Sequence, residues 1–212
     1  MKIILDFDYT LFNAQDFKQA LRDRFSLFGI SSEQFDDSYF TIKQQLGYYN
    51  YNKHLKMLAQ NNKINENDLI LSFQEIVDSA REFLYPDSLF FLKTIKNIPD
   101  AFIYLLTFGQ DKLQQSKIEA SGIKKYFDKI IDTTNSKMDL LKIDRNVSDI
   151  VIINDRGKEI DEIKQQLPPV KAIWLRRPYS LYFNEGCRQK DFEASTLSEA
   201  LSFIKTFINN KD

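Results

Sequence analysis

Two carboxylates, Asp6 and Asp8, stand two positions apart at the end of an apolar run, residues 2–5, that predicts a buried strand. Carboxylates are seldom buried without a partner, so a pair in this position calls for a divalent cation or a phosphoryl group beside it. In an open α/β sheet, ligands bind just beyond the carboxyl ends of the strands, where these two residues would lie. The pair therefore indicates a reactive or metal-binding site at that edge.

The rest of the chain predicts the sheet that would hold this pair. After Pro86 the apolar segments alternate with helical ones, and strands are expected at residues 2–6, 101–106, 129–132, 149–153 and 170–175. Strand–helix alternation with short connections favours right-handed crossovers and a parallel sheet. The sequence therefore predicts an α/β fold with a Rossmann-like three-layer core and a parallel sheet of about five strands.

Before Pro86 the apolar spacing is helical, and no strand pattern interrupts it. Helices are expected at residues 13–28, 52–61 and 66–84, and another should follow a capping box at Ser31–Gln34 and end before Gly47. Gly29 stands where a C-terminal cap belongs. The chain is thus expected to divide into a catalytic core, residues 1–12 and 86–212, and a helical cap domain inserted after the first strand, residues 13–85.

Polar groups follow four of the predicted strands in order along the chain. Asp6 and Asp8 follow the first strand, and the next runs into the sequence Thr107-Phe108-Gly109. Lys137 opens the helix after the third, and the fourth ends in Asn154-Asp155. Because the carboxyl ends of parallel strands meet at one edge of a sheet, we expect these groups to converge.

This ordered set resembles the haloacid dehalogenase superfamily of phosphohydrolases. The family has an aspartate pair followed by threonine, a serine or threonine after the next strand, a lysine and an acidic pair, and all four motifs occur here in order. The resemblance spans nearly the whole chain and includes a helical C1-type cap between the first two motifs, as in the subfamily of phosphoglycolate phosphatases. Only the first motif is specific on its own.

The resemblance implies an aspartyl-phosphate mechanism. Asp6 would be the nucleophile, and Asp8 the general acid and base that protonates the departing alkoxide and later activates water. Mg²⁺ would be the cofactor, because a carboxylate and a phosphate dianion repel each other. The implied ligands are Asp6, the main-chain carbonyl of Asp8, and Asp155, with Glu159 either binding a metal-bound water or holding Lys137.

The other two motifs would bind the phosphoryl group. Thr107 would donate its hydroxyl to a phosphoryl oxygen, with Phe108 and Gly109 beside it, and Lys137 would balance charge in the transition state. Lys129 and Lys142 lie nearby in the sequence and could fill the same role. Thr107 has a structural alternative as the cap of a helix that begins near Gln110.

The acidic motif and the aspartate pair also have departures and alternatives. Tyr9 stands where the family usually has glycine, Asn154 where it has glycine before the acidic residue, and Glu159 where aspartate is frequent. None of these changes removes a reacting group. Asp155 could instead be the N-cap of the following helix.

Substrate choice is expected to depend on the cap. The stretch Gly47–Asn52 carries tyrosines, and Tyr48 and Tyr51 are candidates for stacking on a base or sugar face, although packing between cap helices is the favoured alternative. The lone histidine, His54, is expected to form hydrogen bonds between helices. Arg176 and Arg177 follow the last predicted strand, where they could contact a phosphorylated tail of the substrate, although a solvated loop is the favoured alternative.

Composition limits the partners. With 29 basic and 30 acidic residues the formal net charge is −1, which gives no basic field for binding nucleic acid or a membrane surface. A single cysteine, Cys187, excludes an internal disulfide. No leader sequence or apolar run of spanning length is evident, so a cytoplasmic protein is expected. The sequence leaves open whether it is a monomer or a homodimer.

Phosphomonoester hydrolysis of a small phosphorylated metabolite, such as a sugar phosphate, a nucleotide or a phosphoglycolate-like compound, is the leading function. A phosphomutase would keep the same residues, and a non-catalytic phosphate-binding scaffold is a weaker alternative because no reacting group is missing. Haloacid dehalogenation is disfavoured, because displacement of a halide needs neither a protonated leaving group nor a metal.

Overall fold

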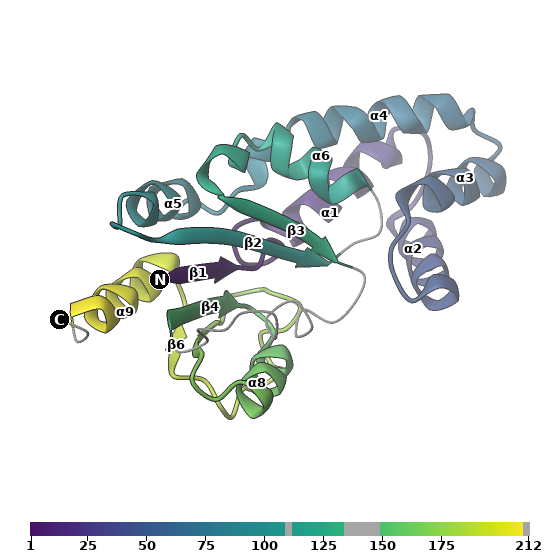
Figure 1. Cartoon of the computed structure of the whole chain (residues 1–212). Coiled ribbons are helices and arrows are strands. Elements are labelled where there is room, and N and C mark those ends of the chain that lie inside the picture. Colours follow the sequence, from purple (N-terminus) through teal and green to yellow (C-terminus); the bar gives the residue numbers. More distant parts are fainter. Residues whose placement is uncertain (109–111, 134–148, 210–212) are drawn as a thin grey trace. The chain divides into compact units, whose positions relative to one another are not determined.

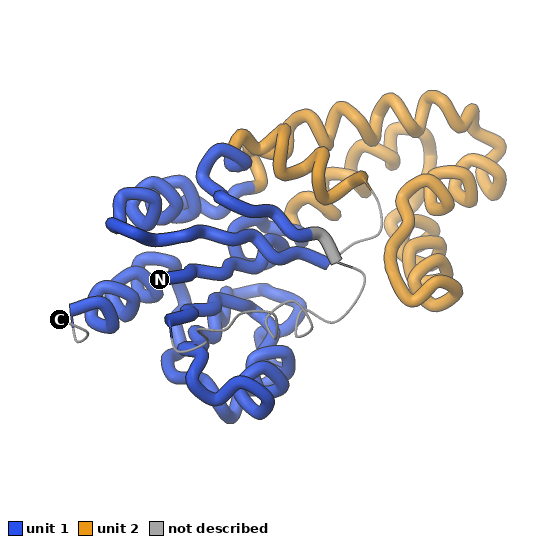
Figure 2. The backbone as a smooth tube through the Cα atoms, in the orientation of Figure 1, with its two compact units in different colours: residues 1–15, 84–108, 123–212 blue, residues 16–83, 109–122 orange. Residues whose placement is uncertain are grey.

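The computed structural model describes residues 1–108, 112–133 and 149–209. Its contacts divide the chain into two compact units, shown in Figure 2. Unit 1 contains Met1–Gln15, Leu84–Phe108 and Ile123–Asp212, and unit 2 contains Asp16–Phe83 and Gly109–Gly122. Asp6, Thr107 and Asp155 fall in unit 1.

Unit 1 is built on a six-stranded sheet in the order β3-β2-β1-β4-β5-β6, in which every described pairing is parallel (Figure 1). The strands are β1 (Lys2–Leu5), β2 (Phe102–Phe108), β3 (Lys129–Thr133), β4 (Ile150–Asn154), β5 (Lys171–Leu175) and β6 (Phe192–Ala194). The predicted α/β fold is confirmed. The expected five strands all occur, and β6 is an additional edge strand that the sequence did not predict.

Both faces of this sheet are buried, which gives the core its three layers. Ile4, Ile152 and Trp174 cluster with Ile160 and Ile163 of α8 (Gly157–Gln166) on one face. Alternate strand residues point to the opposite face, and these are fully buried as well: Ile3, Leu5, Val151, Ile153 and Ile173. The helices α5 (Ser88–Lys96) and α9 (Leu197–Asn209) contact each other, and α9 also contacts β5 and β6.

Unit 2 is helical. It contains α2 (Ser32–Leu46), α3 (Tyr51–Asn62), α4 (Glu66–Asp78), the 3-10 helix η1 (Ala80–Phe83), α6 (Lys112–Ala120) and all but the first two residues of α1 (Ala14–Ser26). The capping box of Ser31 and Gln34 is confirmed, and Gly47 caps α2 with φ of 78°. The predicted helix 66–84 is instead two elements, because the α-helix ends at Asp78.

The remaining described element is a 3-10 turn, η2 (Lys124–Tyr126), before β3. Within the described ranges, no helix is both long and apolar enough to cross a lipid bilayer.

Candidate active site

The first predicted site residues meet because β1 lies between β2 and β4. The register pairs Leu5 with Leu105 on one side and with Ile153 on the other. The main-chain N–H of Asp6 donates to the carbonyl of Ile153 at 3.1 Å, so the β1–β4 ladder continues into the motif. Asp6, the first residue after β1, therefore lies opposite Asn154, and Asp155 follows one residue further, directly after β4.

The side chains at these strand ends are buried. Asp6 is 9% exposed, Asp155 is 2% exposed, and Thr107, near the end of β2, is 1% exposed. Two carboxylates taken out of water at the ends of adjacent strands are costly unless cations or hydrogen-bond donors offset them. The structure thus brings Asp6, Asp155 and Thr107 to one edge of the sheet, as the sequence predicts.

The chain turns sharply after Asp6. The N–H groups of Thr10, Leu11 and Phe12 all point at the carbonyl of Phe7, and the N–H of Tyr9 donates to the carbonyl of Phe12 at 2.7 Å. This turn holds Tyr9 at φ of 58°, in the left-handed region that glycine adopts without strain. The conformation gives a physical reason for a glycine at this position, which the tyrosine occupies at some conformational cost.

Asp155 is held from β5 and from the loop after it. The indole Nε1 of Trp174 donates to the main-chain carbonyl of Asp155 at 2.9 Å. The hydroxyl of Ser180 lies 3.2 Å from Asp155 Oδ2 and donates to it. The N-cap of α8 is Arg156, so the alternative in which Asp155 caps that helix is wrong.

Asn154, Arg156 and Glu159 form a local network at the start of α8. Asn154 Oδ1 accepts from the N–H of Arg156 at 3.0 Å, and its Nδ2 donates to Glu159 Oε2 at 2.8 Å. The other oxygen of Glu159 accepts from Arg156 at 2.7 Å. Asn154 therefore ties Glu159 to the strand end, which a glycine at this position could not do.

Tyr182 packs against Arg156, and its hydroxyl interacts electrostatically with Asp155, Glu159 and Asp6. The guanidinium of Arg156 lies 4.6 Å from the centre of the Tyr182 ring, and the ring of Tyr9 meets the same ring edge-on at 6.0 Å. Burial raises the pKa of the Tyr182 hydroxyl, and Asp155, Glu159 and Asp6 add to the rise while Arg156 opposes it. The phenol therefore stays neutral and can donate a hydrogen bond over the whole physiological range.

The loop after β5 is anchored by Arg177. This residue is 5% exposed, and its guanidinium forms two hydrogen bonds with the Asp87 carboxylate, at 2.7 and 2.9 Å. It also donates to the main-chain carbonyl of Thr10 at 3.0 Å and lies over the ring of Tyr85. The expectation that Arg177 belongs to a solvated loop is therefore wrong, because its charge is paired inside unit 1.

Two predicted substrate contacts, Lys137 and Gly109, lie outside the described residues. Thr107 and Phe108 belong to β2, and Phe108 is 49% exposed. The helix that follows, α6, begins at Lys112 in the structure, and Thr107 is a strand residue rather than its cap.

The residues present fit a Mg²⁺ ion that keeps several of its waters. Among the residues described, no three His, Cys, Asp or Glu side chains group closely enough to form a metal cluster. The resemblance implies only two carboxylate ligands, the buried side chains of Asp6 and Asp155, together with the main-chain carbonyl of Asp8. Hard oxygen ligands from one or two carboxylates, completed by water and phosphate, are what Mg²⁺ usually takes.

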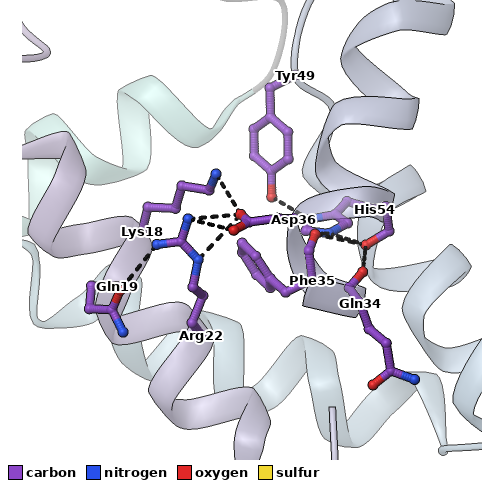
Figure 3. A network of polar contacts seen from close by, with 9 residues as sticks. Lys18, Gln19, Arg22, Gln34, Phe35, Asp36, Tyr49 and His54 are labelled. Atoms are coloured by element: carbon purple, nitrogen blue, oxygen red, sulfur yellow. Dashed lines mark hydrogen bonds and ion pairs between the residues drawn. The ribbon is translucent and has the colours of Figure 1, made fainter. Parts of the chain in front are cut away.

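The remaining predicted contacts lie in unit 2. The ring of Tyr51 stacks on Phe73 with centroids 4.9 Å apart, which is the packing alternative foreseen for the Gly47–Asn52 stretch. His54 is fully buried and forms hydrogen bonds with Ser38, at 2.8 Å, and Tyr49, at 3.0 Å (Figure 3). The expected role of His54 as a hydrogen-bonding residue between helices is confirmed.

The burial of His54 predicts a pH dependence of stability. Burial lowers its pKa to about 4, with Lys18 contributing and the carbonyl of Phe35 and Asp36 opposing. Because the unfolded chain takes up a proton near pH 6.5 and the folded chain does not, this site loses stability as pH falls from 6.5 to 4, by about 3 kcal/mol in all. We expect the unfolding free energy of the wild type, minus that of His54→Gln, to fall by this amount in urea titrations between pH 7 and 4. Parallel pH profiles for the two proteins would contradict the assignment.

Comparison of the sequence with known proteins identifies no relative. No protein-family model matches the chain, and no curated protein matches it.

Comparison of the fold with solved structures gives clear likenesses. A Burkholderia xenovorans LB400 protein described as a haloacid dehalogenase-like hydrolase matches with a TM-score of 0.74 at 17% identity, over 93% of this chain and 95% of that one. The HAD-hydrolase YfnB from Bacillus subtilis, bound to magnesium, matches with a TM-score of 0.61 at 16% identity over 95% and 97% of the two chains. The L-2-haloacid dehalogenase of Xanthobacter autotrophicus matches with 0.62 at 13% identity over 96% and 98%. The fold is therefore that of the haloacid dehalogenase-like hydrolases, and at these identities the likeness concerns the fold alone.

Proposed function

We propose that the chain is a Mg²⁺-dependent phosphomonoester hydrolase that works through an aspartyl-phosphate on Asp6. The observation that carries the proposal is the burial of Asp6 and Asp155 at the ends of adjacent parallel strands, with Thr107 on the neighbouring strand at the other side of β1. A polar edge of this kind on an otherwise apolar sheet suits a phosphoryl group and a cation better than any structural role.

The proposed reaction has two displacements at phosphorus. Asp6 attacks, the P–O bond to the leaving group breaks, and Asp8 gives its proton to the departing alkoxide. Asp8, now a carboxylate, takes a proton from a water that attacks the aspartyl-phosphate, which releases inorganic phosphate and restores Asp6. Two easier steps thus replace one difficult displacement.

The other residues would stabilise charge. The buried hydroxyl of Thr107 would donate to a phosphoryl oxygen, and Lys137 would balance negative charge in the transition state. Asp6, the carbonyl of Asp8, and Asp155 would hold Mg²⁺, whose positive charge would offset the repulsion of the carboxylate nucleophile and the phosphate. We assign Glu159 a supporting place, in which it fixes Asn154 and Arg156 and so the start of α8.

Unit 2 would serve as the cap, as in the subfamily of phosphoglycolate phosphatases. Its composition of helices inserted mainly after β1 supports this proposal. The substrate would be a small phosphorylated metabolite, and Tyr48 is a candidate contact for its leaving group. The edge-on contact between the rings of Tyr9, which follows β1, and Tyr182, which follows β5, supports a compact substrate.

The test is release of phosphate from a generic aryl phosphate in the presence of Mg²⁺, with EDTA as the control. In parallel, release of halide from 2-chloropropionate tests for dehalogenase activity, which one of the similar structures has in its name. We expect metal-dependent phosphate release and no halide release. Halide release without phosphate release would overturn the proposal. A protein that neither releases phosphate from the aryl phosphate nor binds beryllofluoride would overturn it as well.

A further inference from the structure

Ser180 belongs to none of the four motifs, yet its hydroxyl contacts the carboxylate proposed to bind metal. The residue is buried, and it lies on the loop that follows β5. Its Oγ accepts a hydrogen bond from the main-chain N–H of Tyr182 at 3.2 Å and lies 3.2 Å from Asp155 Oδ2. A hydroxyl has a single proton, so the bond from Tyr182 leaves that proton for Asp155.

The loop is shaped to present this hydroxyl. The N–H of Ser180 donates to the carbonyl of Arg177, and the N–H of Phe183 donates to the carbonyl of Ser180. Tyr179, which directly precedes Ser180, adopts a left-handed conformation with φ of 65°. Arg177 in turn is fixed by its two hydrogen bonds to Asp87. The position of Ser180 is thus determined by buried contacts of the loop.

Asp155 is held at two points by this part of unit 1. Trp174 fixes its main-chain carbonyl, and Ser180 fixes one oxygen of its carboxylate. Metal-binding carboxylates are usually oriented by such hydrogen bonds, because a ligand already in its binding rotamer loses less entropy when the ion arrives.

We infer that Ser180 is a positioning residue for the metal site, and that its hydrogen bond to Asp155 sets the affinity of the site for Mg²⁺. The inference rests on the proposed function, since it takes Asp155 as a metal ligand. It assigns to the loop after β5 the orientation of that ligand, a role that no motif of the sequence indicates.

The experiment is a titration of the metal-free protein with Mg²⁺, in which binding is measured by calorimetry and by the fluorescence of Trp174. This residue is the single tryptophan of the chain and is bonded to Asp155, so its emission reports on the site without turnover. We expect Ser180→Ala to raise the Kd for Mg²⁺ by about 10- to 100-fold. The kcat at saturating Mg²⁺ should stay within about threefold of the wild type, because no reacting group is changed.

Matched variants separate positioning from general stability. Ser180→Thr keeps the hydroxyl and should retain most of the affinity for Mg²⁺. Ser180→Cys carries a weaker donor of similar size and should give an intermediate Kd. The cysteine variant replaces Ser180→Ala in the test if the alanine variant fails to fold. Ser121→Ala removes another buried hydroxyl, which donates to the carbonyl of Ile118 in unit 2, and should leave the Kd unchanged.

The outcomes are distinguishable. A wild type that binds Mg²⁺ and releases phosphate, together with Ser180 variants of unchanged Kd, would overturn this inference and leave the proposed function intact. Ser180 variants that unfold at a lower temperature than the wild type in EDTA, but bind Mg²⁺ with an unchanged Kd, would also overturn this inference and leave the proposed function intact. A wild type that neither binds Mg²⁺ nor releases phosphate would overturn both.

Discussion

Asp6→Asn is expected to abolish phosphate release, with kcat lower by at least about 10⁴-fold, because an amide cannot serve as the nucleophile that forms the aspartyl-phosphate. The substitution keeps the size of the side chain at a buried position, so the fold should persist. The measurement is steady-state phosphate release with Mg²⁺ at saturation, together with circular dichroism to show that the variant is folded.

Asp8→Asn is the matched control, since it removes an acid and base but leaves the nucleophile. We expect this variant to form phosphoenzyme from an activated aryl phosphate, whose leaving group needs little protonation, and to hydrolyse it slowly. Acid quenching with labelled substrate should therefore trap label on Asp8→Asn but not on Asp6→Asn. Label on the Asp6→Asn protein, or full activity in either variant, would contradict the assigned roles.

Arg177→Met is expected to lower the free energy of unfolding by about 3–5 kcal/mol, the usual cost of removing one partner of a buried ion pair. Methionine retains much of the packing volume but leaves the Asp87 carboxylate, 19% exposed, without its two guanidinium hydrogen bonds. The carbonyl of Thr10 also loses a donor. Urea denaturation of the two proteins at pH 7 measures the difference.

The neighbouring arginine supplies the control. Arg176 is 35% exposed and forms an ion pair with Glu193 at 3.5 Å, a type of surface pair that contributes about 0–1 kcal/mol. Arg176→Met should therefore cost far less than Arg177→Met, although it also loses a hydrogen bond to the carbonyl of Phe183. If the two variants prove equally stable, the buried pair does not anchor the loop.

The sequence predicts the central part of the site because the signals there are local. Asp6 follows an apolar strand directly, and Asp155 follows another, so the parallel pairing of those strands is enough to bring them to one edge. The special position of Tyr9 could also be noticed, as a departure from glycine, and its φ of 58° now gives the reason.

The contacts that hold this site in place could not be predicted in the same way. Ser180 meets Asp155, and Arg177 meets Asp87, only because the folded sheet brings distant segments together. A serine or an arginine in a polar loop carries no periodicity that marks it as buried. The charge of Arg177 even favoured the opposite prediction, because an arginine is rarely buried unless it is paired.

Element boundaries failed for related reasons. The apolar positions of residues 66–84 fit an α-helix throughout, yet Ala80 lies in a 3-10 helix and is still buried. Spacing of three residues satisfies both helix types, so the pattern could not show where one ends. The strand β6, Phe192–Ala194, is too short to produce a detectable alternation.

The position of β1 at the centre of the sheet constrains how the chain can fold during synthesis. Lys2 faces Phe102 on one side and Ile150 on the other, so both neighbours of the first strand are made long after it. At typical synthesis rates of about 5–20 residues per second, β1 leaves the ribosome seconds before either partner exists. Its apolar side chains must wait unpaired while the helices of residues 16–83, whose contacts are more local, can already assemble. The need for chaperones should therefore be greatest before β2 emerges. At that stage the helices of residues 16–83 can be folded, while β1, which precedes them in the chain, is still unpaired.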